Sequence, residues 1–336
     1  YLATDYLRHA VFSRRQLREV MTWFWDNHFN TYYYKHSIAD FEHREMAGFR
    51  AHAFGRFRDL LGVSAKSPAM LHSLDGVNNM KGRPNENYAR ELMELHTLGV
   101  TGGYSQQDVV DAARAFTGWS EVDGQFVFNA NLHDNGLKVV LGSMLPANGG
   151  QSDGEAVLDL VARHPSTARF VCGKLVTLLV SDIPVDSLIQ QCAVVFQNSV
   201  DAPDQMARVL LTILSSQQFL GTTYRSAKMK TPLELAVGLT RNLGGESGGD
   251  DLAEETQRMG MGLFVNSSPT GYAETGDAWV STSMLLNRVR FLDRALNTTS
   301  TAGDTQFNLM GLMQADVLET AEGIVGRLLD LTLGPT

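Results

Sequence analysis

Carboxylates are concentrated in the segment from Pro84 to His96, where the sequence also predicts a helix. A proline followed by two asparagines is typical of a helix N-terminus, so we expect Asn85 or Asn87 to act as the cap. The helix is expected to stop at Gly99. The segment therefore combines a well-marked helix with side chains that can exchange protons.

Glu91 falls within the apolar face of this predicted helix. At about 100° per residue, one face collects four apolar residues, Tyr88, Leu92, Leu95 and Leu98. Asn87 and Glu94 flank Glu91 at i−4 and i+3 and form a polar stripe along the edge of the buried side. A carboxylate facing a core is costly unless it is paired, protonated or bound to a metal. A partner from another helix or a catalytic role can account for Glu91.

Paired carboxylates are the residue types that glycoside hydrolases use. A carboxylic acid with a raised pKa protonates the leaving oxygen, and a second carboxylate acts as base or nucleophile. We expect Glu91 to be the acid and Glu86 or Glu94 to be its partner. The i, i+3 spacing places the carboxylates of Glu91 and Glu94 about 5–7 Å apart, near the divide between retaining and inverting enzymes. The leading prediction is a hydrolase acting on a polysaccharide or glycoconjugate.

Four further residues are predicted to contact this carbohydrate substrate. Asn87 and His28 would orient it, and Trp25 and Trp119 would stack on sugar rings. His28 ends an apolar stripe on a predicted helix that begins after Ser13, so packing in the core is the alternative role for it.

A metal-dependent enzyme and a non-catalytic scaffold are the two alternative functions. The enzyme would hold a divalent metal with His28, Glu91, His133 and Asp134, and the metal would activate water. Neither the Glu-x-x-His nor the His-Glu-x-x-His spacing occurs, so these ligands would come from separate segments. In a scaffold, the polar stripe around Glu91 would be a buried network that fixes the helix register.

The composition is that of a globular protein, with 43% hydrophobic and 19% charged residues among 336. A formal net charge of −9 argues against nucleic-acid binding. No apolar run reaches the roughly 18 residues that a transmembrane segment needs. The two cysteines, Cys172 and Cys192, are predicted to be buried thiols, with one disulfide bridge as the alternative in an oxidising compartment.

The hydrophobic periodicity predicts a mainly α, multi-helix globular bundle with one small β-hairpin. The hairpin is expected near 125–141, with strands at 125–129 and 137–141 around Asn135-Gly136. After the hairpin, the pattern predicts helices over 156–164, 167–180, 185–198, 204–215, 279–296 and 315–333.

Two further signals concern a helix start and a domain boundary. Ser105 and Asp108 predict a capping box, which gives Asp108 a structural role. The glycine-rich segment 244–249 is the best linker candidate. It gives a main helical domain over 1–243 and a C-terminal helical segment over 250–336 packed on it, or one single domain.

Several motifs resemble the bacterial family called domain of unknown function 1800. They cover nearly the whole chain: Trp23–Phe29, Ser67–Leu71, Asn85–Gly99, Gly103–Val109, Phe116–Trp119, His133-Asp134 with Lys138, Leu141-Gly142, His164–Ala168, Lys230–Pro232 and Pro269–Tyr272. The resemblance implies a mainly helical protein that is often exported, to the periplasm or the extracellular space, and frequently encoded beside a sulfatase-like partner family. It implies no established reaction.

The same resemblance gives two further expectations, one about the N-terminus and one about Asp26. Family members are typically longer at the N-terminus, so an opening helical segment and any export signal are expected to precede Tyr1. At Asp26 the family often has another polar residue, so Asp26 is left out of the predicted site.

Overall fold

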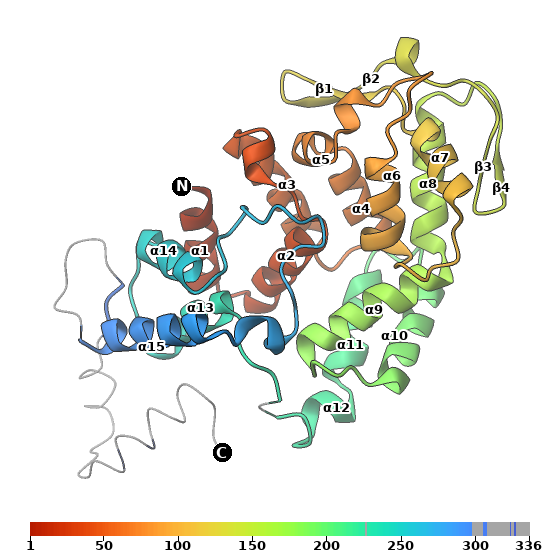
Figure 1. Cartoon of the computed structure of the whole chain (residues 1–336). Coiled ribbons are helices and arrows are strands. Elements are labelled where there is room, and N and C mark those ends of the chain that lie inside the picture. Colours follow the sequence, from red (N-terminus) through yellow and green to blue (C-terminus); the bar gives the residue numbers. More distant parts are fainter. Residues whose placement is uncertain (226, 298–304, 308–322, 324–325, 327–336) are drawn as a thin grey trace. The chain divides into compact units, whose positions relative to one another are not determined.

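The computed structural model describes residues 1–225, 227–297, 305–307, 323 and 326, and Figure 1 shows its helices and strands. The chain divides into two compact units, and each is described by itself. The larger unit comprises Val20–Tyr224 and the loop Phe264–Tyr272. The smaller unit comprises Tyr1–Glu19 and the described residues of Arg225–Leu263 and from Ala273 onward.

Helices dominate the larger unit, which confirms the mainly α prediction. In chain order they are α2 (Gln16–His28, whose first turn belongs to the smaller unit), η1 (Tyr33–Lys35), α3 (Ala39–His52), α4 (Phe57–Ala65), α5 (Pro68–Ser73), η2 (Gly76–Asn78), α6 (Asn87–Glu91), the π-helix η3 (Leu92–Thr97), α7 (Gln106–Ala115), η4 (Ala130–Leu132), α8 (Gln151–Arg163), α9 (Pro165–Leu179), α10 (Asp186–Asn198), α11 (Gln205–Leu214) and α12 (Gln217–Leu220). The helices predicted over 156–164, 167–180, 185–198 and 204–215 correspond to α8 to α11.

Side-chain caps explain where several of these helices begin. The Ser105 hydroxyl accepts a hydrogen bond from the Asp108 amide, and Asp108 accepts one from the Ser105 amide, so the predicted capping box is confirmed. At α5, Ser67 accepts from the Ala69 amide and is followed by a proline at the first helical position.

The larger unit contains two β-hairpins. In the first, β1 (Trp119–Val122) pairs antiparallel with β2 (Gln125–Phe128); in the second, β3 (Lys138–Val140) pairs with β4 (Ser143–Leu145). The predicted strands at 125–129 and 137–141 thus belong to different hairpins, and their predicted pairing was wrong. The turns lie at Asp123-Gly124 and Leu141-Gly142, where all four residues have positive φ, as tight hairpin turns require.

The core of the larger unit is rich in aromatic side chains. Trp25 of α2 and Phe29, just after its end, stack at 6.1 Å between ring centroids, and Phe29 stacks on Phe49 of α3 at 5.5 Å. Phe57, at the start of α4, joins them and is fully buried. This cluster fixes α2, α3 and α4 around one apolar centre.

The loop Phe264–Tyr272 is held by two asparagines, Asn27 in the last turn of α2 and Asn30 just after this helix. The Asn27 side chain donates to the Tyr272 carbonyl at 2.9 Å and accepts from the Tyr272 amide at 2.6 Å. The Asn30 side chain donates to the carbonyls of Asn266 and Ser268 at 3.0 and 2.8 Å. Gly271 has φ +73°, and a Cβ there would overlap the Asn27 backbone oxygen, so only glycine fits this close approach.

The smaller unit is also helical. Its elements are α1 (Leu2–Phe12), α13 (Pro232–Asn242), α14 (Asp250–Arg258), η5 (Gly276–Trp279) and α15 (Thr282–Asn297). Helix α15 confirms most of the helix predicted over 279–296, whereas the one over 315–333 lies outside the described residues apart from 323 and 326.

The segment 244–249 joins α13 to α14 inside this smaller unit and does not separate two units. Helix α1 packs on both α13 and α14, and Arg241 donates to the Val11 carbonyl. The predicted boundary there therefore differs from the observed division, because the N-terminal helix completes the unit that contains the C-terminal helices.

Candidate acid–base site

The carboxylate helix begins close to where the sequence places it. The Asn85 side chain accepts a hydrogen bond from the Asn87 amide at 2.9 Å, and its own amide donates to the Asn79 side chain at 2.9 Å. The asparagine-rich loop is therefore fixed by hydrogen bonds. The N-cap of α6 is Glu86, whose side chain makes no capping hydrogen bond, so the prediction of Asn85 or Asn87 as the cap was wrong. Asn85, one residue before the cap, nevertheless satisfies the first amide of the helix.

Beyond Glu91 the helix widens into the π-helix η3. The wider turn places four residues on the buried side, Leu92, Met93, His96 and Thr97. Leu95 and Glu91 are both partly exposed. Glu91 is therefore less buried than predicted, because that prediction assumed α-helical periodicity as far as Leu98. Single turns of π-helix are frequent at functional sites.

Glu91 and Glu94 form a pair of partly exposed carboxylates on this distorted helix. Partial burial raises the pKa of Glu91, repulsion from Glu94 raises it further, and Arg90 opposes both effects. A raised pKa keeps the Glu91 carboxyl protonated to a higher pH than an ordinary glutamate. A raised pKa is the direction of shift that a general acid requires.

Tyr104 completes this group, which we call the acid–base site: Glu91, Glu94 and Tyr104. Burial and the charge of Glu94 raise the pKa of Tyr104, so Tyr104 lies near Glu94 and its hydroxyl stays protonated. Sequence reasoning missed Tyr104. The signal available was its position after the Gly102-Gly103 turn, immediately before the cap of the next helix.

Glu86 is engaged elsewhere. Its Oε2 accepts from Arg90 at 2.9 Å and from Gln106 at 2.8 Å, and Arg90 also donates to Gln106 at 2.9 Å. This network joins α6 to the start of α7. Two partners were predicted for Glu91, and Glu86 is occupied by its ion pair with Arg90. Glu94 lies beside Glu91 and has no such ion pair among the described residues.

The predicted substrate-binding residues occupy different surroundings. Trp25 and Trp119 are 0% and 2% exposed, and His28 is 1% exposed, so a substrate cannot reach them in this structure. Trp25 donates from Nε1 to the Ala53 carbonyl at 3.3 Å within the aromatic core. Asn87 is partly exposed, and its side chain donates to Asp75 at 3.4 Å.

His28 instead packs against His96 of the π-helix. A hydrogen bond of 2.9 Å joins His28 Nε2 to the His96 carbonyl, and the ring centroids lie 6.1 Å apart. Burial and, secondarily, Lys174 lower the pKa of both rings, that of His96 to about 3. His28 must therefore donate from Nε2 as a neutral ring. His28 Nδ1 and His96 Nε2 have no hydrogen-bond partner within the described chain.

His133 and Asp134 are held in separate interactions near α7 and α8. His133 Nε2 lies 3.2 Å from Asp153 Oδ2, and Lys138 Nζ lies 2.7 Å from the same oxygen. Asp134 is paired with Arg114 at 2.9 Å. Among the described residues, no three His, Cys, Asp or Glu side chains are grouped so that they could hold a metal ion. The structure thus does not bring together the four ligands of the metal-dependent alternative.

A second group of carboxyl groups lies deeper in the larger unit, and we call it the interior acid cluster: Asp26, Glu42 and Glu45. Glu42 and Glu45 of α3 are 0% and 3% exposed. Burial raises the pKa of Asp26 and of Glu45 well above the usual range, and the charge of Glu42 raises both further. Asp26, which the sequence prediction left out, is therefore strongly perturbed.

This cluster was visible in the sequence but was not recognised. Glu42 and Glu45 follow Phe41 and precede Met46 at helical spacing, so both carboxylates share the buried face of α3. A like-charged pair on an apolar face was the signal that could have located it.

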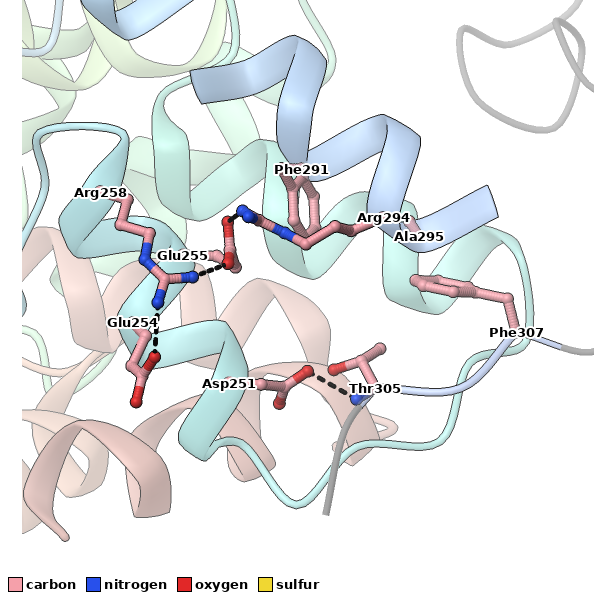
Figure 2. Close-up of a pocket in the computed structure, with 9 residues that line it drawn as sticks. All are labelled: Asp251, Glu254, Glu255, Arg258, Phe291, Arg294, Ala295, Thr305 and Phe307. Carbon is pink, nitrogen blue, oxygen red and sulfur yellow. Dashed lines mark hydrogen bonds and ion pairs between the residues drawn. The ribbon is translucent and has the colours of Figure 1, made fainter. Parts of the chain in front are cut away.

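The smaller unit contains a pocket of about 280 Å³. Figure 2 shows its side chains, which come from α14, α15 and the described residues Thr305 and Phe307. Glu255 accepts from both Arg258 and Arg294, and Glu254 accepts from Arg258 at 2.9 Å. The pocket's arginines are thus already paired with its glutamates, and none of the predicted site residues lines it.

A model of the family described as protein of unknown function (DUF1800) matches residues 1–336. The chain belongs to this family. The match confirms the resemblance carried by the motifs, and DUF1800 membership brings no reaction with it. No curated protein and no solved structure gave a significant match. Within the described part of this DUF1800 chain, no helix is both long and apolar enough to cross a membrane.

Proposed function

We propose that this protein is an exported hydrolase that cleaves glycosidic bonds in a polysaccharide or glycoconjugate. Glu91 acts as the general acid that protonates the leaving oxygen. Glu94 is the second carboxylate, which stabilises the developing positive charge or activates water. Tyr104 is a positioning residue: its protonated hydroxyl, which lies near Glu94, donates to that carboxylate when substrate is bound.

One observation carries this proposal: the two carboxylates are adjacent and partly exposed, and the pKa of Glu91 is raised. A general acid must remain protonated near the working pH, whereas its partner must be ionised. Partial exposure lets a polymer approach both groups. The interior acid cluster has more strongly raised pKa values, but two of its three residues are closed to a substrate of this size.

The test is release of reducing ends from a panel of polysaccharides by the full chain. Wild type is compared with Glu91→Gln and with Glu254→Gln, a matched change at an exposed glutamate of the smaller unit. We expect release by wild type and by Glu254→Gln, and a loss of at least about a hundredfold for Glu91→Gln. Equal release by all three would refute the assignment of Glu91, and no release from any substrate would refute the proposed function.

A further inference from the structure

The two cysteines of the chain face each other across a helix interface. Cys172 lies on α9 and Cys192 on α10, two helices that run side by side and pack together extensively (Figure 1). Both side chains are 0% exposed, and each lies on the buried face of its helix. The interface is therefore closed around the two sulfur atoms.

The two thiols are free, and each changes the ionisation of the other, so they lie near one another in the α9–α10 interface. The interaction with Cys172 lowers the pKa of Cys192, whereas burial raises that of Cys172. Cys192 is thus the thiol that ionises more readily, and the thiolate is the form that attacks a disulfide.

We propose that Cys172 and Cys192 are the site of a disulfide bond that joins α9 to α10. A disulfide requires the two cysteines to approach closely, and the packed interface of α9 and α10 holds both of them on its buried side. The proposal does not depend on the hydrolase function, because it concerns residues outside the acid–base site.

The oxidant in this reaction is a small-molecule disulfide such as oxidised glutathione. The Cys192 thiolate attacks one sulfur of glutathione disulfide, which gives a mixed disulfide and releases one glutathione thiolate. The Cys172 thiolate then attacks the Cys192 sulfur and releases the second glutathione. In total the protein loses two protons and two electrons, and the oxidant becomes two thiols. Because the native thiols are buried, the exchange occurs during folding or local opening.

The disulfide would stabilise α9, the helix that packs against the π-helix carrying Glu94. Helix α9 contacts the π-helix, and a Cβ on Gly99, just past the end of that helix, would touch the ring of Phe170. A covalent link between α9 and α10 restricts the unfolded chain over the segment between the cysteines. The oxidised protein is therefore expected to be the more stable form.

The experiment refolds the full chain with glutathione disulfide, then alkylates it in denaturant and measures its intact mass. We expect no alkylation of the oxidised monomer and two alkyl groups after reduction. The oxidised monomer should also melt about 5–10 °C above the reduced one. This mass measurement on wild type stands even if a cysteine variant folds poorly.

Two variants serve as controls, Cys172→Ala and Cys192→Ala, each compared with itself with and without reductant. Neither should show a reductant-dependent melting temperature. Two alkylated cysteines after oxidative refolding would overturn the proposal. So would a stable glutathione adduct on one cysteine, or oxidation that yields only disulfide-linked dimers.

Discussion

Glu42 and Glu45 lie one turn apart on α3, both buried, yet their hydrogen bonding is unequal. Glu42 accepts from the Thr31 hydroxyl at 2.7 Å, and its other oxygen lies 2.9 Å from His36 Nε2. The Ile38 amide donates to His36 Nδ1, so His36 Nε2 carries the proton and donates to Glu42. Glu45 Oε1, in contrast, has no partner among the described residues. Both oxygens of Glu42 thus accept hydrogen bonds, whereas Glu45 is arranged as a neutral acid.

Glu45→Gln should stabilise the protein at high pH. The pKa of Glu45 is raised in the folded state, so the folded protein holds this proton more tightly and loses stability as pH rises above the usual glutamate value. Glutamine mimics the protonated acid and does not titrate. We expect the free energy of unfolding to rise by about 1–3 kcal/mol at pH 8 and to change little at pH 4.5. Urea unfolding at both pH values measures this, and a loss at pH 8 would contradict it.

His96→Leu should reduce the sensitivity of the protein to acid. The pKa of His96 is lowered to about 3 in the folded state. The stability that this neutral ring contributes is complete above the usual histidine pKa and is lost as pH falls from there toward 3. Between pH 6.5 and pH 5, wild type should lose about 2 kcal/mol more than the variant in urea unfolding. His9→Gln, at an exposed histidine, is the control, and parallel losses in wild type and His96→Leu would exclude this origin.

Asn27→Ala should release the loop Phe264–Tyr272 from α2. The substitution removes both hydrogen bonds that the Asn27 side chain makes with the Tyr272 backbone, one to its amide and one to its carbonyl. We expect a loss of about 2–4 kcal/mol in urea unfolding and faster hydrogen exchange at the Tyr272 amide. Asn131→Ala, at an exposed turn, should show neither effect. Unchanged exchange at Tyr272 would show that other contacts hold the loop.

Tyr104→Phe should change catalysis without changing the fold, if the protein is the hydrolase proposed above. Loss of the hydroxyl removes a hydrogen-bond donor that lies near Glu94, so the partner carboxylate is less well positioned. We expect kcat/KM to fall about tenfold, with a shifted pH profile, while the melting temperature stays within about 2 °C. Tyr34→Phe, at an exposed tyrosine, is the matched control. An unchanged pH profile would argue against a role for Tyr104 in orienting Glu94.

The helices were largely predictable because local signals define them, as the capping box at Ser105 shows. The pairing of the strands was not predictable, because Asn135-Gly136 has the sequence of a tight hairpin turn. In the structure this dipeptide lies in the connection between the two hairpins, where Asp134 accepts a hydrogen bond from the Gly136 amide. The location of the Glu91 and Glu94 pair followed from sequence. Its degree of burial did not, because periodicity cannot reveal where an α-helix becomes a π-helix.

The π-helix has the same effect on the chain as a one-residue insertion into an α-helix. Residues on its two sides are out of phase by roughly one residue's rotation, about 100°. This offset gathers Leu92, Met93, His96 and Thr97 on the buried side of the helix, where His96 meets His28. Point substitutions leave the offset in place. Deleting a single residue such as Leu95 would remove it and rotate His96 and every later residue of the helix relative to Leu92 and Met93.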